Sequence, residues 1–131
     1  MAATVVVMEC PEGLFGPPKP WGEERVFAET SRYAGKLILI RSGEALSFQY
    51  HNRKVETIHV LEGVLGLLVE RDGERRDLRL ASGDTFHIEA GTRHRMLAPQ
   101  GDCLLVEVST PELDDVVRLE DRYGRQGTSA P

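Results

Sequence analysis

The sequence predicts a small all-β protein, a sandwich or barrel built from many short strands. From Glu24 onward, short apolar runs alternate with turn residues about every eight to twelve positions. Before Pro111, no segment keeps the period of a helix for more than about one turn. Regularly spaced short strands of this kind are typical of β-sandwiches and β-barrels.

The first residues are expected to form a strand and then an irregular arm. Residues 4–8 are mostly β-branched and predict a strand, whereas residues 11–20 hold four prolines and predict a loop. Further strands are expected at residues 25–29, 36–41, 45–51, 56–61, 65–71, 75–80, 84–88, 94–98 and 103–109.

Turn residues separate these strands. The pair Asp72-Gly73 predicts a tight hairpin, because this dipeptide suits the twist of two paired strands. Residues 111–114 are compatible with a short helical turn, and the tail from Gly124 is expected to be disordered. The chain therefore reads as an N-terminal strand and arm (1–23), a barrel (24–110), and a C-terminal extension and tail (111–131).

Length and composition describe an ordinary globular domain. At 131 residues the chain is long enough to bury a core of its own. A formal charge of −5 argues against nucleic-acid binding, which needs a basic face, but leaves room for a locally basic pocket. Cys10 and Cys103 form no Cys-x-x-Cys pair, no signal-peptide pattern is recognisable, and no apolar run could cross a membrane. A cytoplasmic protein with no membrane contact is expected.

Four side chains of metal-ligand type stand out. Alternation along a strand places Ser47, Gln49 and His51 on one face, Glu56 returns on the next strand, and His94 comes from a later one. Donors that converge from several strands are how a barrel interior closes around a metal ion. We therefore expect Gln49, His51, Glu56 and His94 to hold one divalent cation.

The glycines around these donors complete two motifs. The first runs G-x5-Q-x-H-x4-E-x6-G over residues 43–63, and the second runs G-x7-G-x2-H over residues 83–94. Both resemble the cupin family, with Gln49 in place of the usual first His and Glu89 in place of the usual Pro. The resemblance implies a double-stranded β-helix, or jelly-roll barrel.

The glutamine points to one branch of that family. Pro-Trp-Gly at 20–22, Ser-Phe-Gln-Tyr-His at 47–51, Gly-Thr-Arg-His-Arg at 91–95 and the ending at 115–125 are similar to type II mannose-6-phosphate isomerases. Those enzymes carry further His residues where this chain has Asn52, Arg53 and Thr57. The resemblance covers residues 19–125.

The resemblance implies an aldose–ketose isomerase that acts on a phosphorylated hexose through an ene-diol. Ser47, Lys36 and Lys54 match positions at which the resemblance implies substrate contacts. Because an ammonium near a cation and partly desolvated has a lowered pKa, Lys54 is expected to be a catalytic base. Arg95, directly after His94, is expected to clamp phosphate or stabilise the ene-diolate in catalysis, and His87 is expected to bind substrate in place of an absent pocket His. Two imidazoles favour Zn²⁺ as the ion, with Mn²⁺, Fe²⁺, Co²⁺ and Ni²⁺ as alternatives.

Other interpretations stay open at this point. Two His and one carboxylate also suit a metal-dependent dioxygenase, and a sugar- or metal-binding module without catalysis would fit the absent His residues. His59 alternates away from Glu56 and predicts packing, whereas Arg118 and Arg125 predict surface ion pairs. The strand at residues 4–8 is expected to cross to a second subunit, which makes a homodimer.

Overall fold

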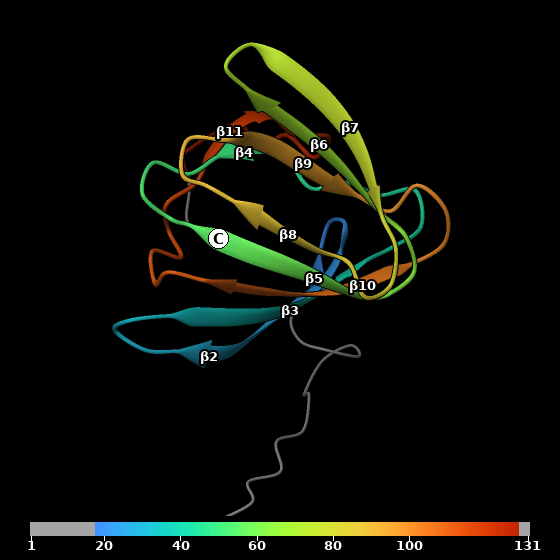
Figure 1. The fold of residues 1–131 in the computed structure, drawn as a ribbon, viewed down its shortest axis with the longest axis horizontal. Coiled ribbons are helices and arrows are strands. Elements are labelled where there is room, and N and C mark those ends of the chain that lie inside the picture. The colour runs from blue at the N-terminus through green and yellow to red at the C-terminus, as the bar shows by residue number, and fades with distance from the viewer. Residues whose placement is uncertain (1–17, 129–131) are drawn as a thin grey trace, which may run out of the picture.

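Two antiparallel sheets face one another in the computed structural model, which describes residues 18–128 (Figure 1). Sheet A has the order β1 (Pro18–Lys19), β2 (Gly22–Glu29), β3 (Ala34–Ile40), β10 (Cys103–Ser109), β5 (Glu56–Glu62) and β8 (Thr85–Ile88). Sheet B has the order β12 (Gly127–Thr128), β11 (Val117–Glu120), β4 (Phe48–Tyr50), β9 (Arg93–Leu97), β6 (Leu65–Arg71) and β7 (Glu74–Leu80). The all-β prediction is confirmed.

Each of the nine strands predicted from residue 25 onward is present, with shifted ends in most cases. The strand predicted at 45–51 is regular only over Phe48–Tyr50. Before it, Ala45 makes a single isolated bridge to Leu97. The strand predicted at residues 4–8 lies outside the described residues. Between residues 18 and 128 there is no helix, and the expected helical turn at 111–114 is an irregular turn closed by Asp115 N donating to Glu112 O.

Three short strands lie where none was predicted. They are β1 in the proline-rich arm, β11 in the C-terminal extension, and β12 in the tail. β12 pairs with Val117 and Arg118 of β11, and β11 pairs with β4, so the C-terminal segment adds to the edge of sheet B. The prediction of disorder from Gly124 is therefore wrong as far as Thr128.

The hairpin prediction at Asp72-Gly73 is confirmed. β6 and β7 pair from Arg71↔Glu74 outward, and both turn residues take positive φ, 53° and 78°. Two successive left-handed residues make a type I′ turn, whose twist matches that of the flanking strands.

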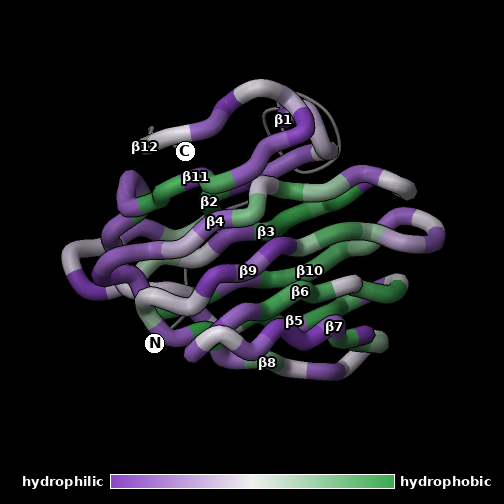
Figure 2. The backbone as a smooth tube through the Cα atoms, turned by 90° about the horizontal axis from the view of Figure 1, so that it is seen from above, coloured by the Kyte–Doolittle hydropathy of each residue, from purple (hydrophilic) through white to green (hydrophobic). Residues whose placement is uncertain are grey.

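The barrel interior is apolar at one end and polar at the other. On β3 the inward residues run from Lys36 to Ile38 and Ile40, and on β10 they run from Glu107 to Leu105 and Cys103. The register pairs Lys36 with Glu107, Ile38 with Leu105 and Ile40 with Cys103, so the polar positions of the two strands meet. Figure 2 shows the hydrophobic stretches of β3, β10 and β6 gathered toward the same end.

The apolar end supplies the stable core. Its buried side chains include Ile40, Val60, Leu65, Leu67 and Leu105, each 1% exposed or less. Full burial of such a side chain contributes roughly 1.5–3 kcal/mol relative to exposure. At the opposite end, the buried carboxylates of Glu56 and Glu107 take the place of apolar side chains, so this end lacks that stabilisation.

Candidate metal centre

Three donors predicted from sequence meet between the two sheets. Glu56 begins β5 in sheet A, whereas His94 lies on β9 and His51 directly follows β4, both in sheet B. All three side chains are buried, with 3% exposure or less. One donor atom from each lies within 4.8 Å of the others, which is compact enough to surround a single ion.

The two imidazoles are fixed by backbone carbonyls. His51 Nδ1 lies 2.6 Å from the carbonyl oxygen of Asp115, and His94 Nδ1 lies 2.9 Å from that of Thr92. A carbonyl oxygen can only accept a hydrogen bond, so each Nδ1 must carry the proton. In the neutral tautomer, Nε2 of each ring then presents its lone pair to the interior. Such an outer hydrogen bond is what orients a metal-ligating histidine.

Both Nε2 atoms face the carboxylate of Glu56. His94 Nε2 lies 3.1 Å from Oε1, and His51 Nε2 lies 3.6 Å from Oε2. Among the residues that the structure describes, none of these four buried atoms has a hydrogen-bond partner. Lone pairs of neutral imidazoles that face carboxylate lone pairs repel one another, unless a proton or a metal ion lies between them. The donor set therefore fits a divalent cation.

Electrostatics in the cluster favour a carboxylate beside positive charge. Burial opposes ionisation of Glu56, yet its contacts with His51, His94 and Lys54 hold its pKa well below the ordinary value. Burial likewise opposes a charged His94, but Glu56 raises the pKa of that imidazole above its usual range. A bound cation would take over the role that the proton on His94 plays in this pair.

Gln49, predicted as the fourth ligand, lies close by. It is the register partner of His94 across the β4–β9 pair and lines the same pocket as His51. Its Oε1 accepts a 2.5 Å hydrogen bond from Ser47 Oγ, a side chain that is itself 1% exposed. Ligation by Gln49 stays a prediction.

Lys54 joins the cluster to a second buried carboxylate. Its Nζ lies 3.2 Å from Glu56 Oε2 and 3.1 Å from Glu107 Oε2. Desolvation acts to lower the pKa of Lys54, but the two carboxylates outweigh it and raise that pKa above its ordinary value. This direction is opposite to the lowering predicted from the sequence. Burial and the neighbouring Glu56 raise the pKa of Glu107.

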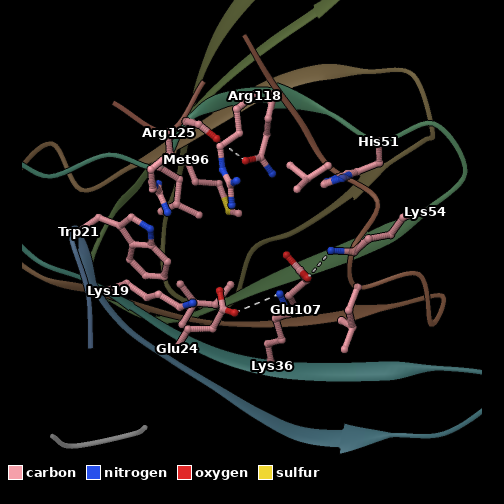
Figure 3. Close-up of a pocket in the computed structure, with 16 residues that line it drawn as sticks. Lys19, Trp21, Glu24, Lys36, His51, Lys54, Met96, Glu107, Arg118 and Arg125 are labelled. Atoms are coloured by element: carbon pink, nitrogen blue, oxygen red, sulfur yellow. Dashed lines mark hydrogen bonds and ion pairs between the residues drawn. The ribbon is translucent and has the colours of Figure 1, made fainter. Parts of the chain in front are cut away.

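A pocket extends from these groups along the polar end of the barrel (Figure 3). Its lining includes five basic side chains and two acidic ones, although the whole chain has a formal charge of −5. The basic ones are Lys19, Lys36, Lys54, Arg118 and Arg125, and the acidic ones are Glu24 and Glu107. A locally basic pocket in an acidic protein favours an anionic ligand.

The remaining predicted site residues divide between this pocket and the outside. Ser47 and Lys36 line it, and Lys36 is paired with Glu24 at 3.2 Å. His87 does not line it; the side chain is half exposed on β8 and bonds to Thr57 and Glu89. Arg95 does not line it either, because alternation on β9 turns it away from His94, and its Nε donates to Leu46 O. His59 bonds to Thr85 and lies outside the three-donor cluster.

Glu107, Arg118 and Arg125 are among the residues of the pocket that were not assigned to it from the sequence. Glu107 alternates with Leu105 and Cys103, so a charge on the buried face of β10 was the available signal. Arg118 and Arg125 were predicted as surface ion pairs, but Arg118 is only 8% exposed and both line the pocket. Arg118 lies on β11 and Arg125 in the connection between β11 and β12, two strands that the sequence pattern did not indicate.

Solved structures with the same architecture support the fold. A conserved protein with a double-stranded β-helix domain from Klebsiella pneumoniae matches with a TM-score of 0.69 at 17% identity, over 82% of this chain and 91% of that one. The capsular polysaccharide assembling protein CapF from Staphylococcus aureus matches with a TM-score of 0.72 at 17% identity, over 79% of this chain and 33% of that one. Two sheets closed around an inward His-Glu-His group make this protein a cupin.

The sequence comparisons identify the branch. Residues 17–121 match the family model described as mannose-6-phosphate isomerase C-terminal, and the chain belongs to that family. Mannose-1-phosphate guanylyltransferase ManC of Salmonella typhimurium is 36% identical over 111 residues, which are 82% of this chain and 22% of that protein. The xanthan biosynthesis protein XanB of Xanthomonas campestris is 33% identical over 111 residues, which are 82% of this chain and 23% of that protein. The chain thus spans about a fifth of the length of these curated relatives.

One finding concerns membranes. Within the described part of the chain, no helix has the length and apolar character needed to cross a bilayer.

Proposed function

We propose that this protein is a metal-dependent sugar-phosphate isomerase that interconverts mannose 6-phosphate and fructose 6-phosphate. The observation that carries the proposal is the buried His51–Glu56–His94 group, whose inward donor atoms converge within 4.8 Å of one another. The only ion pair that these atoms form outside the group, among the described residues, is that of Glu56 with Lys54. Membership of the mannose-6-phosphate isomerase C-terminal family supports the substrate class. The basic pocket beside the cluster suits a phosphorylated ligand.

His51, Glu56 and His94 would hold the ion, with Gln49 as the fourth donor. Two imidazoles and one carboxylate favour Zn²⁺, with Mn²⁺, Fe²⁺, Co²⁺ and Ni²⁺ as alternatives. When bound, a divalent ion supplies Lewis acidity toward the carbonyl and hydroxyl oxygens of the open-chain sugar.

Proton transfer is assigned to Lys54 and Glu107, which line the pocket beside the cluster. Isomerisation removes a proton from C2 of the aldose and returns one to C1. The Glu107 carboxylate is the candidate acceptor, because burial raises its pKa and makes it a stronger base. Lys54 lies 3.1 Å from Glu107 and keeps a positive charge beside the site where an ene-diolate would form.

A coupled assay tests the proposal directly. Protein purified without chelator is analysed for metal, and formation of fructose 6-phosphate from mannose 6-phosphate is followed before and after chelation. Activity that disappears with the metal and in His94→Ala, but persists in His59→Ala, supports the isomerase. His59 is the matched control because it lies outside the three-donor cluster and bonds to Thr85.

One observation favours a second candidate. The three donors that lie within 4.8 Å of one another are two His and one carboxylate, the set that non-haem Fe²⁺ dioxygenases use. Oxygen uptake by the Fe²⁺-loaded protein, without isomerisation, would assign this function instead. Tight binding of sugar phosphates with turnover no faster than in solution would assign a non-catalytic binding module.

A further inference from the structure

Resting on the proposed function, we infer that Arg118, Arg125 and Lys19 form an anion subsite for the phosphate at the far end of the sugar. The three side chains line the pocket that also contains His51 and Lys54. Figure 3 shows Lys19 and Arg125 at one side of this pocket, His51 and Lys54 at the other, and Arg118 extending between them. The subsite draws on both sheets, because Lys19 belongs to β1 and Arg118 to β11.

The sheet register places Arg118 relative to the metal donors. Arg118 is opposite Gln49 on β4, and Gln49 is opposite His94 on β9. Directly opposed residues point to the same face of a sheet, so all three side chains face the interior. Adjacent strands are about 4.8 Å apart, which puts the backbone of Arg118 about 10 Å from that of His94. His94, Gln49 and Arg118 thus lie along one row across sheet B.

Charge is uneven across the pocket. Lys36 pairs with Glu24, and Lys54 pairs with Glu107, so each acidic lining residue already faces a lysine. Burial and the nearby positive charge of Arg125 lower the pKa of Arg118, with Asp121 and Glu24 acting in the opposite direction. Positive charge that is crowded in this way is relieved by a phosphate, which accepts several N–H donors from guanidinium groups.

Arg125 is held in place for such a role. Its Nε and one terminal nitrogen each lie 3.0 Å from the carboxylate of Asp121, and its backbone N donates to the same side chain. The Asp121 carboxylate is fully buried, whereas the Arg125 side chain is 28% exposed. A guanidinium fixed on one edge and open on the other is pre-organised, so it loses little freedom when it binds an anion.

The separation along the row predicts which phosphate binds. If C1 and C2 lie at the metal donors, a phosphate on C1 stays beside them, whereas a phosphate on C6 extends toward Arg118. The subsite therefore selects sugars whose phosphate is at the end opposite the carbonyl. Fructose 6-phosphate should bind well, and fructose 1-phosphate and fructose should bind poorly.

Calorimetric titration tests this with the sugars in Zn²⁺-loaded protein, because the choice between the two phosphate positions requires C1 and C2 at the ion, and with inorganic phosphate in chelator-treated protein. The probes are inorganic phosphate, fructose 6-phosphate, fructose 1-phosphate and fructose. Arg118→Gln, Arg125→Gln and Lys19→Gln should each weaken phosphate and fructose 6-phosphate at least about tenfold, as loss of a charge-assisted contact would. Arg79→Gln is the matched control, because Arg79 is exposed on β7 at the other edge of sheet B.

Two variants guard against a folding artefact. Arg118→Lys keeps the buried positive charge, and Lys19→Gln alters only a two-residue edge strand. Circular dichroism checks that each variant is folded. Phosphate affinity that is unchanged in the folded variants, or fructose 1-phosphate that binds as tightly as fructose 6-phosphate, overturns the subsite. Phosphate binding that maps to these residues in a protein without isomerase activity keeps the subsite and rejects the proposed function. Isomerase activity whose KM is unaffected by Arg118→Gln and Arg125→Gln keeps the proposed function and rejects the subsite.

Discussion

His94 Nε2 lies 3.1 Å from Glu56 Oε1, although the Nδ1 proton of the same ring is already donated to Thr92 O. An imidazole in this position faces the carboxylate either as a cation or with a metal ion between them. The pair therefore links the two sheets through a site whose donor atoms are stabilised by a proton or a cation between them.

Replacement Glu56→Gln should abolish tight metal binding. The amide keeps the size of the side chain but removes the negative charge that two imidazoles face, and we expect Zn²⁺ affinity to fall by more than about 100-fold, beyond the loss typical for an outer-shell partner. Competition with a chromogenic chelator measures this. Glu89→Gln is the control, because Glu89 is half exposed and bonds to His87 outside the cluster. Equal Zn²⁺ affinity in wild type and Glu56→Gln would remove Glu56 from the ligand set.

Lys54→Met should separate metal binding from catalysis. Lys54 Nζ lies 3.2 Å from Glu56 Oε2, so its ammonium competes with a metal ion for the same carboxylate. Without it, we expect Zn²⁺ to bind about tenfold more tightly, while isomerisation slows by about 10²–10⁴ if Lys54 assists proton transfer. Lys36→Met is the matched control for Zn²⁺ affinity alone, since that buried lysine pairs with Glu24 outside the three-donor cluster. Weaker Zn²⁺ binding in Lys54→Met would show that the lysine supports the cluster and does not compete with the ion.

Much of the fold followed from alternation and turn residues. β6 and β10 were predicted to the residue, because each is an apolar run bounded by glycine or aspartate turns. β1, β11 and β12 were missed because two of them have only two residues, and Val117–Glu120 lies in a charged segment that becomes a strand only by pairing with β4. Such pairing depends on tertiary structure, so the local strand propensity of these residues does not predict it.

The site divides in the same way. His51, Glu56 and His94 were predicted because motif spacing fixes which strands they occupy, and the structure brings them within bonding reach of one ion. Glu107 and Arg118 come from strands that no motif links to the site, so their inward direction appears only once the sheets are assembled. Arg95 directly follows His94 in sequence, but strand alternation turns it away from the pocket.

Arg95→Gln and His87→Gln should leave the site intact. Arg95 donates to Leu46 O and Glu120 O, and His87 bonds to Thr57 and Glu89. Neither Arg95 nor His87 lines the pocket. We expect kcat and KM for mannose 6-phosphate to stay within about twofold, with a stability loss of about 1 kcal/mol for Arg95→Gln from its lost hydrogen bonds. Steady-state kinetics and urea unfolding measure these quantities. A drop in kcat of tenfold or more for either variant would return that residue to the active site.

The Asp115 carboxylate should contribute both to the free energy of unfolding and to the affinity for Zn²⁺. Its side chain accepts hydrogen bonds from the backbone N–H groups of Asn52, Arg53 and Lys54, and its carbonyl accepts the Nδ1 proton of His51. Partial burial opposes ionisation, but these backbone donors outweigh it and lower the pKa of Asp115 to about 2. The carboxylate thus holds the loop after β4 that carries His51, a candidate metal ligand.

Because this pKa is depressed in the folded state, the stabilisation is complete above the ordinary aspartate value and is lost as the pH falls from about 4 toward 2. Asp115→Asn should cost about 1 kcal/mol near pH 7, at the low end for a charged acceptor since the side chain is only partly buried, and the difference from wild type should shrink at about pH 2 to 3. Zn²⁺ affinity should fall by about 10- to 100-fold as His51 loses its fixed orientation. Urea unfolding at several pH values and Zn²⁺ titration check both, with exposed Asp114→Asn as the control. A stability difference that persists unchanged at pH 2 would place the acid-sensitive interaction elsewhere in the fold.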